Sequence, residues 1–270
     1  MDSAIKFCAL GALYNGDKEE YLDKCLTSIA NQTLKLPIYI VIDGPINNDL
    51  ESKLAEYAFL NITFLKLEEN YGLAIALAHG VNFLKANYDY AIRFDSDDIN
   101  MPNRFENLCN YIEQFQPDLV SSHMYEVDEN DMIFSERKVP IEDFKIKQTI
   151  AYRNPINHPA SAFKISSVIA SGGYKEMPFF EDWYLWSRMF NKGYKIENID
   201  DFLVSFRATD AMVSRRYGLD YVKHEARFFS SRSSENLINP IKNWSAFLLR
   251  LAVKVFGFGV YKKIFFWIRR

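Results

Sequence analysis

Three aspartates stand within four positions, directly after an apolar run. The stretch 93–105 reads RFDSDDINMPNRF, and Asp95, Asp97 and Asp98 follow the apolar residues 88–92. Like charges this close repel one another and raise each other's proton affinity, so the cluster is costly unless a cation or an array of donors compensates it. The spacing therefore predicts that a positively charged group belongs at this position.

Several kinds of site place acids in such a pattern. An EF-hand would use Asp95 and Asp97 as its first and third ligands, but Ile99 and Asn100 stand where a ligand and the sharp-turn glycine are needed. A phosphatase would use Asp95 as nucleophile and Asp97 as acid, although no nearby lysine or phosphate loop supports it unambiguously. A Mg²⁺ or Mn²⁺ site would combine these carboxylates with substrate phosphates. A solvated acidic turn is the structural alternative.

The segments around this cluster alternate between strand-like and helix-like patterns. Four apolar runs predict strands, at residues 5–15, 38–45, 62–70 and 89–95. Helical spacing of apolar residues predicts helices over 19–32 and 72–87. This alternation predicts an α/β fold with a single Rossmann-like, mostly parallel sheet flanked by helices, which binds its ligand at the carboxyl ends of the strands. Four polar residues fall at those ends, namely Asn15, Asp43, Asn70 and Asp95.

The second half of the chain is less regular. Its pattern predicts a helix over 101–115, a hairpin over 118–140 that turns around Glu129-Asn130-Asp131, and helices over 141–152 and 179–193. No repeat or linker-like segment interrupts it. We therefore predict one domain over 1–236, with halves at 1–100 and 101–236, followed by a tail at 237–270.

The tail differs from the rest in charge. It contains seven Lys or Arg and no acid, so the net charge of −3 combines a tail of +7 with a body of −10. Eight aromatic residues are interleaved with these cations, and no uncharged stretch approaches the roughly 20 residues that span a bilayer. We expect an amphipathic helical tail that lies on an anionic membrane surface. The alternative is a helix that packs on the protein's own core.

Cysteine usage and the N-terminus indicate a compartment. Cys8, Cys25 and Cys109 lie far apart, which argues against a zinc site and a disulfide framework and fits a reducing cytoplasm. The N-terminal apolar run is short and reads as a strand, not as a signal peptide. We expect a cytoplasmic enzyme, peripheral on the inner face of the plasma membrane, with no nucleic-acid partner.

Taken in order, the motifs of this chain resemble glycosyltransferase family 2, whose members have the GT-A fold. The resemblance runs from about Phe7 to Arg207 and rests on ALYNGDKEEYLDKCLTSIANQT, VIDGP, LEENYGLAIALAHG, RFDSDDINMPNRFE, NHPASAF, GGY and FFEDWYLWSRM. Each motif alone is weak, but together, in this order and spacing, they are specific. The later motifs further resemble bacterial enzymes that assemble O-antigen, capsule or exopolysaccharide repeat units.

The resemblance implies that residues 1–100 form a nucleotide-binding half and residues 101–236 an acceptor half. It also implies roles for residues at the strand ends. The nucleotide sugar would be held by Leu13, Tyr14, Asn15, Asp43, Asn70, Gly72 and Asp95. Asp43 would accept a hydrogen bond from the base, or else simply form the turn before Gly44-Pro45. Asp95 and Asp97 form the Asp-x-Asp motif that meets the ribose and a diphosphate-bound Mn²⁺ or Mg²⁺, with Asp98 as a further metal ligand.

The group that would activate the attacking acceptor hydroxyl lies in a second pair of acids. A sugar hydroxyl that attacks an anomeric carbon must lose its proton, so a carboxylate within reach is required. The resemblance assigns this role to Asp182, whereas acids that only favour the helix dipole are the structural alternative. Asn157, His158, Glu181 and Trp183 are candidates for contact with the acceptor or donor sugar. Three arginines either close over the diphosphate or form a solvated basic patch: Arg207, Arg215 and Arg216.

We therefore predict an inverting glycosyltransferase. It would transfer a hexose, glucose or galactose, from a UDP-sugar to a saccharide linked to undecaprenyl diphosphate, in the synthesis of lipopolysaccharide O-antigen or capsule. The alternatives are a phosphatase with an aspartyl nucleophile and a non-catalytic, membrane-bound protein that binds nucleotide sugars.

Overall fold

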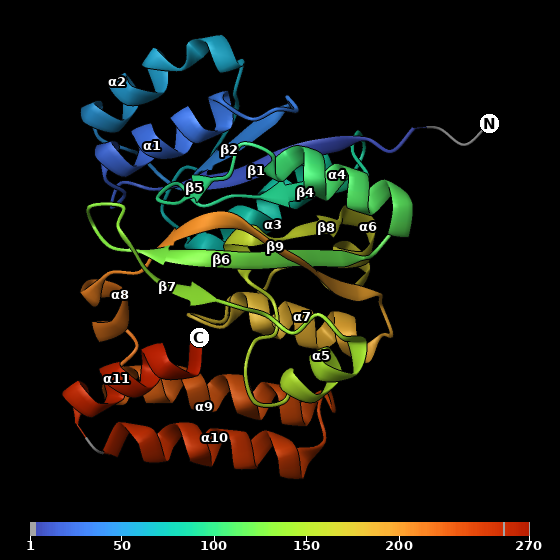
Figure 1. Cartoon of the computed structure of the whole chain (residues 1–270), viewed down its shortest axis with the longest axis vertical. Helices are drawn as coiled ribbons and strands as arrows, with labels where there is room; N and C mark the ends of the chain where they lie inside the picture. Colours follow the sequence, from blue (N-terminus) through green and yellow to red (C-terminus); the bar gives the residue numbers. More distant parts are fainter. Residues whose placement is uncertain (1–3, 256, 270) are drawn as a thin grey trace.

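The first half of the chain forms the parallel part of a mixed sheet (Figure 1). The computed structural model describes residues 4–255 and 257–269. Strands β3 (Thr63–Lys66), β2 (Ile38–Ile42), β1 (Phe7–Leu13) and β4 (Tyr90–Arg93) lie side by side and run parallel. Helices α1 (Glu19–Ala30), α2 (Asn48–Glu56) and α3 (Leu73–Leu84) connect them. The predicted βα alternation is confirmed, so the loops after these strands meet at one edge of the sheet.

The second half extends the same sheet in a mixed arrangement. Beyond β4 follow β8 (Ala162–Lys164), β6 (Leu119–Val127), β9 (Ile196–Arg207) and β5 (Ile99–Asn100), and β7 (Ile133–Arg137) pairs with β6. The predicted helix before the hairpin is α4 (Arg104–Phe115), and the predicted hairpin is β6–β7, in which Asp131 turns the chain with a positive φ. Strands β8, β5 and β7 run against their neighbours. Most of the sheet is parallel, as predicted.

Helices cover both faces of the sheet. On one face, α1, α2 and α4 pack against Ala9 and Leu13 of β1. On the other, α3, α6 (Ile165–Ala170) and α7 (Glu181–Asn191) pack against Cys8 and Leu10. Because successive strand residues point to opposite faces, one apolar strand contributes to two cores. This double burial explains why the strands read as continuous apolar runs.

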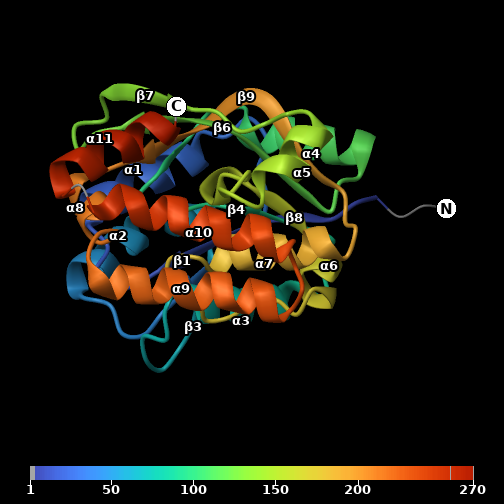
Figure 2. The ribbon, with the colours of Figure 1, turned by 90° about the horizontal axis from the view of Figure 1, so that it is seen from below.

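The chain after β9 is helical and lies against α7. After α5 (Asp143–Thr149) and the short α8 (Asp210–Ser214), helices α9 (Leu219–Ser234), α10 (Pro240–Val255) and α11 (Phe258–Arg269) complete the chain, and Figure 2 shows α9 and α10 side by side. Phe228 of α9 stacks on Phe180 with ring centroids 4.7 Å apart, and Phe229 contacts Phe247 of α10 at 5.6 Å. These aromatic contacts connect the tail to the core through α9.

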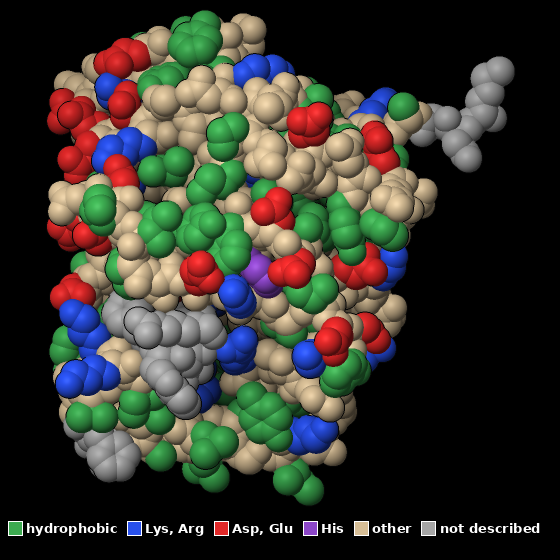
Figure 3. Space-filling view, viewed as in Figure 1, with side chains coloured by type: hydrophobic (Ala, Val, Ile, Leu, Met, Phe, Trp, Pro, Cys, Tyr) green, Lys and Arg blue, Asp and Glu red, His purple; other side chains and the backbone are tan. Residues whose placement is uncertain are grey.

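One face of α10 is buried and the opposite face is exposed. Asn243 is fully buried, where its side chain donates to the carbonyl of Phe229, and Ala246 is nearly so. The exposed face carries large apolar side chains: Ile241, Trp244, Leu248 and Leu249. Figure 3 shows hydrophobic side chains along the lower edge of the molecule, where α10 lies in Figure 1. Among residues 4–255 and 257–269, no helix is long and apolar enough to cross a bilayer. The predicted boundary at residue 236 stays a prediction.

Candidate functional site

A cavity of about 720 Å³ opens where the parallel strands end. Its floor consists of the loops after β1, β2 and β4, and α7 and the helices α8–α11 form the opposite side. Most of the predicted site residues line it: Leu13, Tyr14, Asp43, Asn70, Gly72, Asp95, Asp97, His158, Glu181, Asp182 and Trp183. Strand ends and α7, far apart in sequence, therefore face one cavity. We call Asp43, Asp95 and Asp97 the strand-end wall.

Asp43 is held by backbone groups of the loop before α3. Its two carboxylate oxygens accept from the N–H groups of Tyr71 and Gly72, at 2.8 and 2.9 Å. Gly72 has a φ of 89°, a left-handed conformation that favours glycine, and it precedes the first residue of α3. Gly44 packs so tightly against Asn70 that a side chain there would clash with backbone. Asp43 therefore shapes the loop beside the cavity while remaining in its lining.

Asp95 and Asp97 are both partly buried at the end of β4. The Arg93 guanidinium, which is fully buried, donates to Asp95. Burial, together with the negative charges of Asp95 and Asp17, raises the pKa of Asp97 to about 7. Both causes disfavour the ionised carboxylate, so the repulsion expected within this cluster adds to the effect of burial at Asp97.

Three predicted residues lie outside the cavity lining. Asp98 is buried behind it, where one carboxylate oxygen accepts from the Arg207 N–H at 2.9 Å and the other has no partner among the described residues. Asn157 is fully buried and donates to the carbonyl of Ser122 at 2.9 Å. Asn15 is exposed. The structure thus places Asp98 and Asn157 in supporting positions and turns Asn15 toward solvent.

The second acidic pair begins α7. Burial raises the pKa of Asp182 to about 6, and burial with the neighbouring charge of Asp182 raises that of Glu181 to about 7. Asn154 donates to one oxygen of Asp182 at 2.7 Å, and the Trp183 N–H donates to the other at 2.6 Å. A carboxylate oriented by two donors, with a pKa near the working pH, has the properties of a general base.

Trp183 and His158 have structural partners within the lining. The Trp183 indole donates to the carbonyl of Ile150 at 2.9 Å, and its ring packs on Phe228 with centroids 4.8 Å apart. His158 is hydrogen-bonded through Nε2 to the Tyr174 hydroxyl at 2.9 Å, and burial holds its pKa well below the usual range. A neutral histidine is therefore expected here, held between the core and the cavity.

Sequence reasoning missed two residues of the site, Asp17 and Asn154. Asp17 lines the cavity, accepts from the Tyr14 N–H at 3.1 Å and the Ser96 hydroxyl at 2.9 Å, and has its pKa raised by burial to about 6. Its position in a tight turn after the first strand was the available signal. Asn154, the partner of Asp182, lies in a loop whose sequence indicates only that it is a loop.

Basic side chains gather on the remaining side of the cavity. They come from β7 and the following loop, from the loop after α5, and from α8 to α10: Arg137, Lys138, Arg153, Arg215, Arg216, Arg250 and Lys254. Arg207, by contrast, is buried behind the lining and donates to the backbone carbonyls of Asp97 and Asp128. The cavity therefore carries both signs of charge, on different elements.

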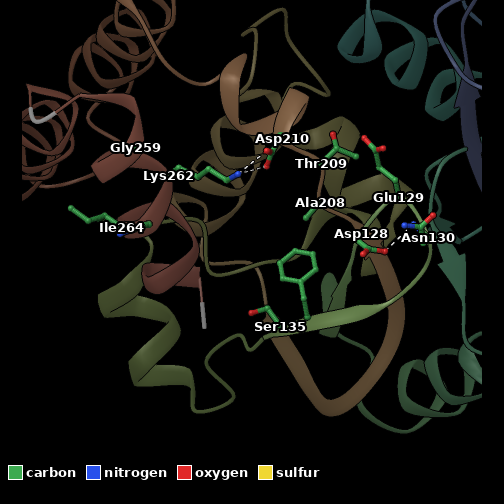
Figure 4. A pocket seen from close by; sticks show the side chains of 12 residues that line it. Asp128, Glu129, Asn130, Ser135, Ala208, Thr209, Asp210, Gly259, Lys262 and Ile264 are labelled. Atoms are coloured by element: carbon green, nitrogen blue, oxygen red, sulfur yellow. Dashed lines mark hydrogen bonds and ion pairs between the residues drawn. The ribbon is translucent and has the colours of Figure 1, made fainter.

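A second hollow, of about 1230 Å³, lies beside α11 (Figure 4). Two of its three acids are engaged within the protein: Asp210 pairs with Lys262, and Asp128 accepts from the N–H groups of Asn130 and Met132. These acids stabilise a helix contact and a turn. Ile264 lines both hollows, so α11 separates them. The candidate site is the cavity at the strand ends.

The strand-end wall suits a hard divalent cation. The part of the chain that the structure describes contains no cluster of three or more His, Cys, Asp or Glu that would hold a metal alone. Mg²⁺, however, is usually bound through one or two carboxylates together with substrate phosphates and water. Asp95 and Asp97 supply two such carboxylates facing a common cavity, and a bound cation would offset the burial and the neighbouring charges that raise the pKa of Asp97.

Solved structures with the same arrangement support the fold assignment. A mannosyltransferase from Pyrobaculum calidifontis, solved with GDP-Man and Mn²⁺, matches 97% of this chain and 74% of its own with a TM-score of 0.64 at 15% identity. The S. aureus TarS fragment 1–349, solved with UDP-GlcNAc, matches 84% of this chain and 66% of its own with a TM-score of 0.62 at 16% identity. The fold is GT-A.

Sequence comparisons identify the family to which the chain belongs. The sequence model described as glycosyl transferase family 2 matches residues 12–172. The amylovoran biosynthesis glycosyltransferase AmsE of Erwinia amylovora is 33% identical over 95% of this chain and 98% of its own. An Escherichia coli UDP-Gal:alpha-D-GlcNAc-diphosphoundecaprenol beta-1,3-galactosyltransferase is 32% identical over 97% of this chain and 98% of its own. The chain is a glycosyltransferase and belongs to glycosyltransferase family 2.

Proposed function

We propose that this enzyme transfers a hexose from a UDP-sugar to a saccharide linked to undecaprenyl diphosphate, with inversion at the anomeric carbon. The product would be an intermediate of a bacterial surface polysaccharide, an O-antigen or a capsule. Support comes from the E. coli relative, a galactosyltransferase that acts on diphosphoundecaprenol-linked GlcNAc, and from the role of the E. amylovora relative in amylovoran biosynthesis. A galactosyl or glucosyl donor is the specific expectation.

The observation that carries the proposal is that two sets of acids open onto one cavity. Asp95 and Asp97 stand at the strand ends, and Asp182 stands at the start of α7. The charge of Asp95 is among the causes that raise the pKa of Glu181, after burial and Asp182, so the two sets lie within electrostatic reach. A leaving group and an attacking hydroxyl require such separate but facing positions.

On the attacking side, Asp182 is the general base. The acceptor hydroxyl oxygen forms a bond to the anomeric carbon, its proton passes to the Asp182 carboxylate, and the bond from the anomeric carbon to the diphosphate oxygen breaks. Asn154 and the Trp183 N–H hold the carboxylate in position. With a pKa near 6, Asp182 is ionised at neutral pH and ready to accept the proton.

On the leaving side, the strand-end wall binds the donor. Asp95 and Asp97 would hold Mn²⁺ or Mg²⁺, and Asp98 would support them from behind. When bound, the cation supplies positive charge that stabilises the departing phosphate oxygens. Tyr14 lies in the lining, partly exposed, where its ring can contact the base, and Asp17 orients its backbone.

The proposed location is the inner face of the plasma membrane, with the exposed face of α10 against the lipid. Ile241, Trp244, Leu248 and Leu249 recur at helical spacing and are all exposed, with side-chain exposures from 40% to 81%. No acid occurs after residue 236. Apolar side chains beside cations favour an anionic bilayer surface.

The test is a screen of nucleotide sugars against a synthetic GlcNAc-diphosphate-lipid acceptor, with the product linkage determined by NMR. We expect transfer from a UDP-hexose with inverted anomeric configuration. Release of phosphate from small phosphoesters would support a phosphatase instead. Nucleotide binding without turnover on any acceptor would support a non-catalytic protein.

A further inference from the structure

Helices α10 and α11 contribute directly to the wall of the site cavity. Arg250 and Lys254 of α10 and Tyr261 of α11 line it, beside Arg216, which follows α8. We call these four residues the tail wall. Three of them belong to the basic, aromatic tail at 237–270. This segment, which contains no acid, therefore lines the same cavity as the proposed catalytic acids.

A buried carboxylate fixes the cations of the tail wall. Glu225 of α9 is fully buried and accepts from Arg250 Nε and, at 2.7 Å, from Lys254 Nζ. The Lys254 side chain is only 7% exposed. One buried carboxylate between two cations leaves a net positive charge, and both cations are also in the cavity lining. Their position therefore depends on α9 and α10 together.

Arg216 carries a donor that lacks an acceptor. The Tyr261 hydroxyl donates to the Arg216 carbonyl at 2.8 Å, which ties α11 to the loop after α8. Nη1 of Arg216 is buried and has no hydrogen-bond partner within residues 4–255 and 257–269. A buried guanidinium N–H without a partner is costly, and five fixed donors suit phosphate oxygens well. This atom is placed to receive an anion.

The tail wall lies on the same side of the cavity as the general base. The Arg250 guanidinium lies 5.6 Å from the centre of the Trp183 ring, and Trp183 follows Asp182 in α7. Burial raises the pKa of Asp182 and of Glu181, and Arg216 is among the charges that oppose this rise for both. By contrast, Asp95 and Asp97, which are proposed to hold the cation at the donor phosphates, stand at the end of β4.

We propose that the tail wall is an anion subsite that binds the diphosphate of the lipid-linked acceptor, and that the tail completes the acceptor site. This inference rests on the proposed function. An acceptor sugar whose hydroxyl faces Asp182 carries its diphosphate on another carbon of the same saccharide, so cations beside Asp182 stand where that anion must lie. Its lipid then leaves toward α10, whose outer face is apolar.

The test compares three acceptors that carry the same sugar: a lipid diphosphate, a lipid monophosphate and an uncharged alkyl glycoside. For the wild-type protein we expect kcat/KM on the diphosphate to exceed that on the alkyl glycoside by about tenfold or more, as for a charge-assisted hydrogen bond. Arg216→Gln should raise the KM for the diphosphate acceptor by about 10-fold to 100-fold and leave the KM for the donor within about twofold.

Two further variants complete the experiment. Tyr261→Phe removes the hydrogen bond to the Arg216 carbonyl but no charge, so we expect a smaller rise in the acceptor KM, of about threefold to tenfold. Arg227→Gln, on an exposed part of α9 outside the cavity lining, is the matched control and should change neither KM. Circular dichroism and a melting curve check that each variant folds. If Arg216→Gln does not fold, the acceptor KM of Tyr261→Phe tests the inference in its place.

The outcomes separate the inference from the proposed function. Equal wild-type transfer to the diphosphate acceptor and the alkyl glycoside would overturn the inference and leave the proposed function standing. A rise in the donor KM that matches the rise in the acceptor KM would assign the tail wall to the donor diphosphate, which also overturns it. No wild-type transfer from any UDP-sugar to any of the acceptors would contradict both.

Discussion

The strand-end wall and the tail wall face the same cavity but are supported in different ways. In the strand-end wall, Asp43 accepts from two backbone N–H groups, and Asp95 pairs with the fully buried Arg93. In the tail wall, Arg250 and Lys254 depend on a single side chain, Glu225. Backbone loops at strand ends therefore support negative charge, and side-chain contacts between helices support positive charge.

This difference predicts how each wall responds to change. Ionised Asp97 in the strand-end wall is destabilised by burial and by the charges of Asp95 and Asp17, which together raise its pKa to about 7. In the tail wall, Arg250 and Lys254 share one buried carboxylate, Glu225. Loss of the Asp97 charge should therefore stabilise the protein, and loss of the Glu225 charge should destabilise it. The largest effect is expected where a buried partner is removed.

Glu225→Ala should produce the largest change in stability. It leaves Arg250 and Lys254 beside a buried space without their carboxylate, and breaking a buried ion pair costs about 3–5 kcal/mol. Urea unfolding of the variant should show a decrease in the free energy of unfolding of this size. The exposed pair Asp220–Lys223, on the same helix, is the control, and Asp220→Ala should leave the free energy of unfolding nearly unchanged, because solvent screens the pair. Equal decreases in the free energy of unfolding for Glu225→Ala and Asp220→Ala would contradict the stabilising role assigned to the buried Glu225.

Asp97→Ala should weaken donor binding without affecting the tail wall. We expect the affinity for UDP in the presence of Mn²⁺ to fall by about 10-fold to 100-fold, because a carboxylate ligand of the cation is lost. Calorimetric titration with and without Mn²⁺ measures this change. Arg216→Gln should leave the same affinity unchanged. If UDP bound the Asp97→Ala variant as tightly as the wild type, the strand-end wall would not be the donor site.

Asp97→Asn should stabilise the protein when no divalent cation is present. The pKa of Asp97 is higher in the folded chain than in the unfolded chain, so the folded state binds more protons and loses stability as pH rises from about 4 to about 7. At pH 8 the amide removes this cost, and we expect a gain of about 1–2 kcal/mol. The gain should disappear at pH 4. A variant less stable than the wild type at pH 8 would contradict the electrostatic account.

The pH dependence of transfer should report Asp182. Because burial raises its pKa to about 6, the carboxylate becomes protonated as pH falls through that value and can no longer accept the hydroxyl proton. At saturating substrates we expect kcat at pH 5 to be about tenfold lower than at pH 7. A rate independent of pH over this range would exclude Asp182 as the base in a rate-limiting chemical step.

The sequence was sufficient to predict the strand-end wall because local signals define it. Asp43 and Asp95 directly follow apolar strand runs, and parallel strands bring their carboxyl ends to one edge. Asn15 carried the same signal but is exposed, because the turn closed by the Tyr14 carbonyl and the Asp17 N–H directs Asp17 inward instead. Which side chain of a turn points inward depends on side-chain packing, and the spacing of residues in the sequence does not show this packing.

The tail wall was not predictable from local patterns. Arg250 and Lys254 were counted among the cations of an amphipathic segment, and that pattern is the same for a helix on a membrane and for a helix on a protein core. Their position depends on Glu225, which lies 25 residues before Arg250 and shows no local signal. The structure shows that one face of α10 packs on α9 while the opposite face remains exposed.

The most direct test of the central claim is to separate donor binding from transfer in Asp182→Asn. The variant keeps the shape of the side chain and leaves the strand-end wall intact. We expect the affinity for the UDP-sugar to stay within about threefold of the wild type, while kcat for transfer to the diphosphate-linked acceptor falls by about 10²–10⁴, as for loss of a general base. Full transfer by Asp182→Asn would contradict the assignment of the attacking side.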